Sequence, residues 1–158
     1  MRFSQQDRLR AMYVGGYGNQ TAHRYARFWN AVLRLGLLPR RWVTLEVPGR
    51  ASGQPTRFPL GMADVNGEWY LVSMLGECNW VRNVRAAHGH ATLRRRRSRP
   101  VMLEEIPASR RPPIIKRYVQ IAPGGRPHIA VDRRQPVEAF VPIAADHPVF
   151  HVTPRKVK

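Results

Sequence analysis

Hydrophobic positions near the start of the chain follow a helical spacing. In residues 21–38, apolar side chains fall at i, i+3, i+4, i+7 and i+8, which is one face of a helix. Thr21 is the expected N-cap, and Gly36 and Pro39 are expected to end the helix. Arginines lie off that face, so the segment is predicted to be a basic amphipathic helix. Its apolar face consists of Tyr25, Phe28, Trp29, Val32 and Leu33.

From residue 42 onward, the pattern changes to the alternation typical of strands. Pro48-Gly49 ends the first strand, and Asn66-Gly67 is a strong hairpin signal between the next two. The predicted strands are 42–47, 57–64, 68–74, 91–95, 100–106 and 149–152. Helices are predicted at 79–88, with Asn79 as its cap, and at 109–122, with two prolines near its first turn. Residues 123–148 are predicted to be mostly loop.

The order of these elements indicates the fold class. Antiparallel hairpins predominate, and the strand–helix alternation of a parallel sheet is missing. We therefore predict an α+β protein, mainly antiparallel β: a small barrel or roll with an N-terminal helix and flanking helices packed outside. Residues 21–158 are expected to form one domain, preceded by a loose, glycine-containing arm at 1–20.

Composition narrows the class of protein further. The 158 residues carry 27 Lys+Arg against 10 Asp+Glu, a formal net charge of +17. The electrostatic field of such a charge attracts polyanions, although a proteome biased toward arginine would produce the same excess of basic residues. The single cysteine, Cys78, excludes a disulfide framework. No apolar run reaches the roughly 18 residues of a spanning helix, and the start resembles no secretory signal, so a cytoplasmic setting is expected.

The usual catalytic motifs are missing from the sequence. It contains no nucleophile elbow, zinc-protease helix, phosphate-binding P-loop or dinucleotide fingerprint. His88 and His90 form the only close histidine pair, and no carboxylate or cysteine stands nearby to complete a metal site. We interpret them as a surface pair and predict no metal.

Two other segments carry residues suited to anions. Residues 48–57 place two glycines, Ser52, Arg50 and Arg57 on a strand–turn–strand passage, which suits phosphate or carboxylate. Residues 73–85 pass from a strand through a glycine turn into a helix, whose N-terminal N–H groups favour an anion. Taken singly, each segment also fits an ordinary turn, or an amphipathic helix with solvated arginines.

Together, the two segments resemble a known family. The sequence shows Gly49-Arg50-Ala51-Ser52-Gly53-Gln54-Pro55, then Ser73-Met74-Leu75-Gly76, then Trp80-Val81-Arg82-Asn83-Val84-Arg85-Ala86. This ordered set resembles the deazaflavin-dependent nitroreductase family of actinobacteria, and the resemblance covers residues 40–106. It implies a split β-barrel similar to that of FMN-binding reductases. It also implies coenzyme F420, an 8-hydroxy-5-deazaflavin with a phosphate and an oligoglutamate tail, as cofactor.

The family's pattern also implies site residues. Arg50, Ser52 and Arg57 match positions that hold the phosphate and tail, and Ser73 matches a serine close to the ring, making it the candidate catalytic residue. Trp80 and Asn83 match the helix flanking the cofactor. The full predicted cofactor site is Arg50, Ser52, Gly53, Pro55, Arg57, Phe58, Pro59, Ser73, Met74, Leu75, Gly76, Asn79, Trp80, Asn83 and Arg85.

Two departures from the family's pattern limit what is carried over. Ala51 and Met74 stand where many members have basic residues, so Arg82 or Arg85 is expected to compensate. No tyrosine follows Tyr118, whereas nitro-reducing members use tyrosines near the C-terminus, so nitroimidazole reduction is not carried over. The predicted substrate pocket consists of Tyr25, Trp29 and His128.

The leading hypothesis is an oxidoreductase that transfers a hydride from the deazaflavin to a small quinone, enone or nitroaromatic. Such chemistry needs no nucleophile, because the cofactor supplies it. A coenzyme carrier without turnover is the alternative on the same scaffold, and FMN is the less favoured cofactor. Nucleic-acid binding through Arg94–Arg97, Arg99 and nearby aromatics is a weaker alternative, so no nucleic acid is expected. The helix at 21–38 either attaches to anionic lipid or caps the barrel with its apolar face. A monomer or a homodimer is expected.

Overall fold

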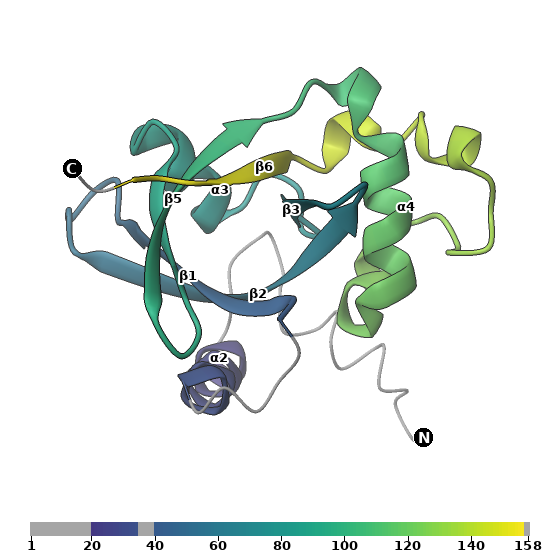
Figure 1. Cartoon of the computed structure of the whole chain (residues 1–158). Helices are drawn as coiled ribbons and strands as arrows, with labels where there is room; N and C mark the ends of the chain where they lie inside the picture. Colours follow the sequence, from purple (N-terminus) through teal and green to yellow (C-terminus); the bar gives the residue numbers. More distant parts are fainter. Residues whose placement is uncertain (1–19, 35–39, 157–158) are drawn as a thin grey trace, which may run out of the picture.

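Six antiparallel strands form the centre of the molecule. The computed structural model describes residues 20–34 and 40–156. Its strands close a barrel in the order β1-β2-β3-β6-β5-β4 (Figure 1). The predicted α+β fold, mainly antiparallel β with helices outside, is therefore confirmed. The strands are β1 (Trp42–Pro48), β2 (Pro55–Val65), β3 (Glu68–Val72), β4 (His90–Arg94), β5 (Ser98–Glu105) and β6 (Val149–Pro154).

The barrel separates two hydrophobic cores. Successive side chains of a strand point to opposite faces, so each strand contributes to both. Leu71 of β3 and Phe150 of β6 belong to the barrel interior, while their neighbours Val72 and Val149 belong to a second cluster outside it. The alternation of apolar and polar residues along the sequence therefore predicts both where a strand lies and to which face of the barrel each of its side chains points.

Helix α4 (Pro112–Ile121) covers the second core. It packs Ile115, Tyr118 and Val119 against the outer face of the barrel beside β2 and β3 (Figure 1). It begins three residues later than predicted, because Ala108–Arg110 form a separate 3₁₀ turn, η2, and prolines occupy the first helical turn. The segment predicted as loop contains three short 3₁₀ helices: η3 (Pro123–His128), η4 (Val137–Phe140) and η5 (Ala144–Asp146).

The β2–β3 hairpin has the predicted turn. Asn66 and Gly67 have φ angles of 51° and 79°, as a type I′ turn requires. Strand β2 starts two residues before its predicted start because Pro48 and Pro55 still face each other in the β1–β2 ladder. Strand β3 ends at Val72, two residues short of the prediction.

Helix α3 (Asn79–Ala86) crosses the barrel near β1. Its N-cap is Cys78 rather than the predicted Asn79, and no side chain caps it. Asn79 is the first helical residue, which leaves its amide side chain available to a neighbouring loop. The helix ends at Ala86, two residues before the predicted end.

Helix α2 (Gln20–Arg34) lies against β1 and β2 below the barrel in Figure 1. Gln20 already belongs to the helix, so Thr21 lies inside it and is not its cap. Residues 1–19 of the predicted arm, and the predicted end at Gly36–Pro39, lie outside the described residues. Asn30 faces the barrel and accepts a 2.7 Å hydrogen bond from Thr44 Oγ1. Phe28 is 62% exposed, so the alternative in which the apolar face caps the barrel is wrong at this residue.

Candidate functional site

The β1–β2 connection is a tight turn built by the first motif. The N–H of Gly49 donates to the Gln54 carbonyl, and the N–H of Gly53 donates to the Gly49 carbonyl, both at 2.8 Å. Gly53 has a φ of 69°, and a Cβ on Gly49 would lie 2.9 Å from Ser52 Oγ. Ser52 Oγ also accepts a 3.2 Å bond from the N–H of Gln54. The motif's glycines and serine therefore shape a turn that presents Arg50 toward α3.

Arg50 meets α3 at two positions one helical turn apart. Its Nη1 donates to Asn83 Oδ1 at 2.8 Å, and its backbone N–H donates to the same oxygen at 3.3 Å. Its Nη2 lies 3.4 Å from Asn79 Oδ1. The two sequence motifs therefore converge in space, as the resemblance to the family implies.

Asn83 is buried beneath this contact and fixes it. Only 4% of the residue is exposed, and its Nδ2 donates to Thr56 Oγ1 at 3.2 Å. Thr56 in turn donates to the Val47 carbonyl at 2.6 Å. We call Arg50, Thr56, Asn79 and Asn83 the Arg50 cluster. Because both ends of the Asn83 amide are occupied, its orientation is fixed.

The Arg50 cluster is electropositive. No carboxylate of the described residues lies within ion-pair distance of Arg50, which is exposed. The adjoining N-terminus of α3 has no side-chain cap and no acidic residue in its first turn. A guanidinium next to the positive end of a helix dipole suits an anionic ligand.

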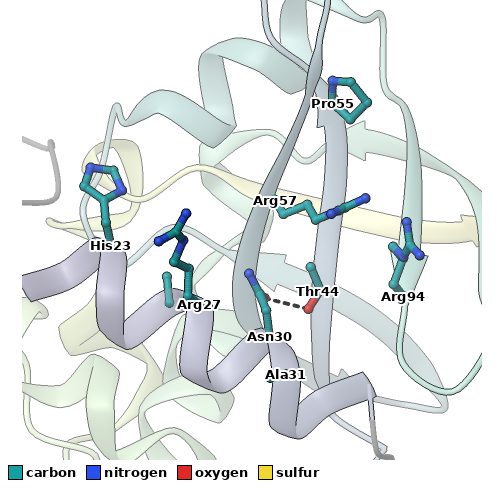
Figure 2. A pocket seen from close by; sticks show the side chains of 9 residues that line it. His23, Arg27, Asn30, Ala31, Thr44, Pro55, Arg57 and Arg94 are labelled. Carbon is teal, nitrogen blue, oxygen red and sulfur yellow. Dashed lines mark hydrogen bonds between the residues drawn. The ribbon is translucent and has the colours of Figure 1, made fainter. Parts of the chain in front are cut away.

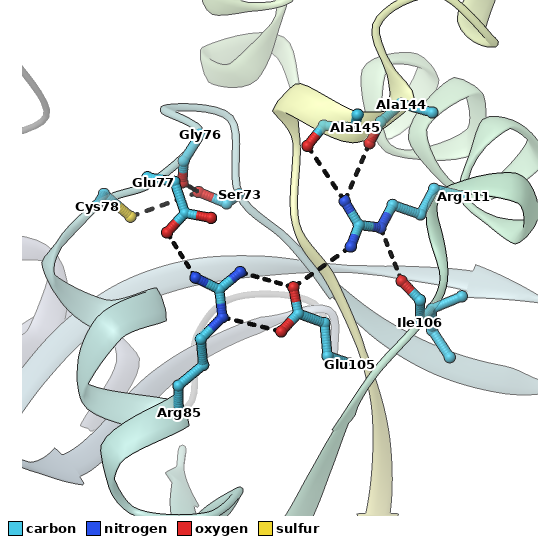
Figure 3. Close-up of polar contacts among 10 residues, drawn as sticks. All are labelled: Ser73, Gly76, Glu77, Cys78, Arg85, Glu105, Ile106, Arg111, Ala144 and Ala145. Atoms are coloured by element: carbon cyan, nitrogen blue, oxygen red, sulfur yellow. Dashed lines mark hydrogen bonds and ion pairs between the residues drawn. The ribbon is translucent and has the colours of Figure 1, made fainter.

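Ser73 lies at the end of β3 and is fully buried. Its hydroxyl donates to the Gly76 carbonyl at 2.6 Å and is 3.4 Å from Cys78 Sγ (Figure 3). Its backbone N–H donates to the Pro148 carbonyl, and its own carbonyl oxygen lies 2.8 Å from His147 Nδ1. Ser73 therefore fixes the turn that leads into α3, and its hydroxyl reaches this turn rather than an open surface.

Arg85 is occupied by carboxylates. It contacts Glu77 at 2.6 Å and makes two bonds to Glu105, at 2.7 and 2.9 Å (Figure 3). Arg111 continues this network from Glu105 to the carbonyls of Ile106 and Ala144. Hydrogen bonding to Arg85 holds the pKa of Glu105 below its usual range, and partial burial opposes this shift. Arg85 thus joins α3 to β5, an arrangement different from the predicted anion contact.

Arg57 also has a carboxylate partner. Its Nε donates to Glu46 Oε2 at 2.7 Å, and Arg94 Nη1 donates to the same oxygen at 2.7 Å. These bonds, with the Arg57 bond the stronger cause, hold the pKa of Glu46 below its usual range against partial burial. Half of the Arg57 side chain remains exposed, so its other N–H groups face solvent.

The apolar residues of the predicted site mostly support the barrel. Trp80 is buried and packs against Phe150 with ring centroids 5.6 Å apart. Phe58 and Leu75 are half-buried against the same core, and Met74 packs on the outer core. Gly53 and Pro55 are exposed in the turn, Pro59 is half-buried opposite Thr44 in the ladder, and Gly76 has a φ of 70°.

The predicted substrate pocket is divided between distant elements. Trp29 lies on α2, where it makes an edge-to-face contact with Phe28, while His128 ends η3. The Tyr25 side chain lies outside what the structure describes. The cavity next to α2 is lined on the helix side by His23, Arg27 and Asn30, none of which belongs to the predicted apolar face.

Several site residues were not predicted from the sequence. Thr56 lies between the two predicted residues Pro55 and Arg57, so its position next to the motif could have identified it as a site residue. Glu46, Glu77 and Glu105 pair with arginines, Arg111 among them, that lie 6 to 48 residues away in the sequence, and no local pattern reveals such pairs. Among the described residues, no three His, Cys, Asp or Glu side chains gather as metal ligands. The described helices include none that is long and apolar enough to span a bilayer.

Comparison with known proteins gives a family match. The profile of the family described as F420H(2)-dependent quinone reductase matches residues 19–142. Curated protein sequences give no match. A solved F420-H2-dependent reductase, FDR-A, shares 22% identity with a TM-score of 0.50, over 73% of this chain and 96% of its own.

Two further solved structures are similar in fold. A chain described as a domain-swapped dimer shares 20% identity with a TM-score of 0.51, over 84% of this chain and 96% of its own. A protein of unknown function from Agrobacterium tumefaciens shares 13% identity with a TM-score of 0.54, over 85% of this chain and 55% of its own. At these identities, the likeness concerns the fold of the barrel.

Proposed function

Since the chain belongs to the F420H2-dependent quinone reductase family, we propose that it reduces a small conjugated acceptor, a quinone, an enone or a nitroaromatic. It is an oxidoreductase, and coenzyme F420 is its cofactor. When bound in its reduced form, the coenzyme supplies the hydride. The family's description supports the acceptor, and the geometry of the Arg50 cluster supports the proposal on the residues.

The residues present fit a polyanionic coenzyme. Arg50 is exposed and has no carboxylate partner among the described residues, and no side chain caps the neighbouring N-terminus of α3. The chemistry of this donor set, one guanidinium beside a helix N-terminus, matches phosphate or carboxylate oxygen. This observation carries the proposal.

The residues in and around the cluster would have different roles. Arg50 and the first-turn N–H groups of α3 would bind an anionic part of the coenzyme. Asn83 and Thr56 would act as positioning residues, because they orient Arg50 without being exposed themselves. Ser73 would position the turn before α3, and Arg85 would hold α3 against β5. Trp80 would stiffen the wall behind the site rather than stack on the ring.

The protein adds little acid–base chemistry at this place. The Arg50 cluster contains one arginine, one threonine and two asparagines, none of which exchanges a proton near neutral pH. The proton that follows the hydride onto the acceptor would come from solvent. The chain's task is to bind, orient and shield the reactants.

Steady-state oxidation of the reduced coenzyme tests this function. Menadione, an enone and a nitroaromatic are compared as acceptors with the full chain. Continuous oxidation with menadione that scales with enzyme concentration is the expected result. Binding of the coenzyme without turnover of any acceptor would instead support the alternative of a carrier.

We also propose that α2 attaches the enzyme to an anionic lipid surface, which would bring it to a lipid-soluble acceptor. Phe28 is 62% exposed, Arg24 and Arg27 are exposed beside it, and the helix contains no acidic residue. Co-sedimentation with vesicles containing phosphatidylglycerol should fall for Phe28→Gln and stay unchanged for Val141→Gln, which alters another exposed apolar residue. Equal sedimentation of both variants and the wild type would contradict the attachment.

A further inference from the structure

Five of the six residues around the turn between β4 and β5 are arginines. We call residues 94–99, Arg-Arg-Arg-Arg-Ser-Arg, the arginine hairpin. Its turn is closed by a 3.2 Å hydrogen bond from the N–H of Arg95 to the carbonyl of Arg97, and Arg94 faces Ser98 across the ladder. The strand pairing therefore holds a dense group of guanidinium side chains on a defined turn.

Among the described residues, no carboxylate pairs with the outermost charges of the arginine hairpin. Arg94, at its base, donates to Glu46 at 2.7 Å. Arg96, Arg97 and Arg99 are exposed, and none of the ion pairs between described residues involves them. Like charges so close in sequence repel one another, so a partner that brings negative charge to the turn relieves an existing repulsion.

The arginine hairpin lies on the same side of the barrel as helix α2 (Figure 1). Arg94 at its base and Arg27 of α2 line one cavity between the helix and the barrel (Figure 2). Arg24 and Arg27 are exposed, the helix contains no acidic residue, and Phe28 is 62% exposed. The two elements together form a cationic face that also presents an apolar side chain.

This combination suits the surface of an anionic bilayer. Guanidinium groups bind the phosphates of lipid headgroups, and an aromatic side chain beside them can enter the boundary between headgroups and acyl chains. A single-stranded nucleic acid also carries phosphates, but its bases bind to aromatic stacking platforms. Trp69 and Tyr70 lie on β3, three strands from β4 in either direction around the barrel, and Trp80 is buried. None of these three side chains is therefore available to stack a base at the arginine hairpin.

We propose that the arginine hairpin is a second membrane contact, which binds the phosphates of anionic lipids while α2 lies on the same bilayer beside it. The inference extends the proposed attachment to anionic lipid and rests on it. A single helix on a bilayer leaves the barrel free to rotate about the helix axis, whereas two contacts on different elements fix its orientation. The side of the barrel that carries α2 and the arginine hairpin then faces the lipid.

Co-sedimentation of the full chain with vesicles of phosphatidylglycerol and phosphatidylcholine tests the second contact. Arg97→Gln should lower the partition coefficient about fivefold, and Arg96→Gln combined with Arg97→Gln about 25-fold, because each arginine at an anionic surface contributes a roughly fivefold gain. Arg110→Gln is the matched control, since it removes the same charge from an exposed position on η2, and it should partition like the wild type. Unfolding midpoints should be the same for all variants. Equal partitioning of the wild type, both hairpin variants and Arg110→Gln would overturn the proposal.

Three other results separate this inference from the proposed function. If Phe28→Gln lowers partitioning and the hairpin variants do not, α2 is the membrane contact and the second contact is wrong. If the hairpin variants lower it and Phe28→Gln does not, the arginine hairpin binds lipid and the contact through α2 is contradicted. If Arg97→Gln weakens binding of a single-stranded oligonucleotide and leaves vesicle partitioning unchanged, nucleic acid is the partner and the proposal is overturned. Oxidation of the reduced coenzyme by menadione in solution tests the proposed reaction independently of all three.

Discussion

Arg50 Nη1 donates a 2.8 Å hydrogen bond to Oδ1 of Asn83, a residue 33 positions further along the chain. This bond joins the β1–β2 turn to the second turn of α3. Asn83 accepts this bond with Oδ1, while its Nδ2 donates to Thr56. An exposed cation is thus oriented by a buried polar side chain, an arrangement that favours ligand binding over simple surface charge.

Removal of the Asn83 side chain should weaken both coenzyme binding and the fold. Asn83→Ala leaves Arg50 without its main acceptor and Thr56 without a donor, so we expect about a tenfold loss in affinity and a stability loss of about 1–3 kcal/mol. Coenzyme titration and urea unfolding measure the two effects. Arg50→Ala combined with Asn83→Ala should cost less than the sum of the single variants. Additive losses would show that the two side chains act independently.

The turn before α3 should tolerate no side chain at Gly76. This residue has a φ of 70°, and a Cβ there would lie 2.8 Å from the Asp146 carbonyl oxygen. Gly67 has a φ of 79° with open space around it, so Gly67→Ala carries the backbone strain alone. We expect Gly67→Ala to cost about 1–2 kcal/mol of unfolding free energy and Gly76→Ala clearly more. Equal losses in denaturant unfolding would mean that the contact with residue 146 is of no consequence.

Loss of the Ser73 hydroxyl should lower the stability of the fold and change the rate of the reaction little. Ser73→Ala leaves the half-buried Gly76 carbonyl without its donor, at a cost of about 1–3 kcal/mol of unfolding free energy. Because the hydroxyl reaches the turn, kcat at saturating coenzyme should change little once the protein is folded. Ser109→Ala, at an exposed position, is the control. A drop in kcat of more than a hundredfold with unchanged stability would assign Ser73 a direct role in catalysis.

The Arg85–Glu105 pair should make stability depend on pH in the acid range. Hydrogen bonding to Arg85 lowers the pKa of Glu105 in the folded protein, so the pair's contribution is present above the ordinary carboxyl pKa of about 4.3 and disappears as the pH falls through the folded value. Glu105→Gln should lower stability at pH 7 by about 1 kcal/mol or less, because both side chains are partly exposed.

That difference between Glu105→Gln and the wild type should shrink as the pH falls below the ordinary carboxyl pKa, and it should vanish only below the lowered pKa of Glu105 in the folded protein, where both carry a neutral side chain. Thermal unfolding between pH 3 and 8 measures it. Glu104→Gln, the exposed neighbour, should show no such dependence. A stability difference that stays constant over this range would contradict the assigned role of the ion pair.

The sequence predicts the barrel well because its signals are local. Alternation fixes which residues of β1 and β3 enter the interior, and Asn66-Gly67 specifies its turn chemically. Helix α2 is less well predicted than the barrel strands. The spacing of its apolar residues identifies a helix but does not indicate which part of the protein covers its apolar face. Polar residues such as Asn30 meet the barrel instead, and Phe28 faces outward.

The candidate site was predicted in part. The resemblance of the two motifs to the family implies that Arg50 and Asn83 converge, and they do. The partner of each arginine could not be predicted, because Arg85 pairs with Glu105 across 20 residues and Arg94 pairs with Glu46 across 48. Such pairings depend on strand register and helix placement, so the sequence leaves the number of free cations open.

Calorimetric titration of the full chain with oxidised coenzyme F420 tests the central claim most directly. The wild type should bind with a dissociation constant in the micromolar range or below, Arg50→Gln should bind about tenfold more weakly, and Arg110→Gln should match the wild type. No heat of binding to the wild type at tens of micromolar coenzyme, or identical isotherms for Arg50→Gln and the wild type, would contradict a coenzyme site at the junction of the β1–β2 turn and α3.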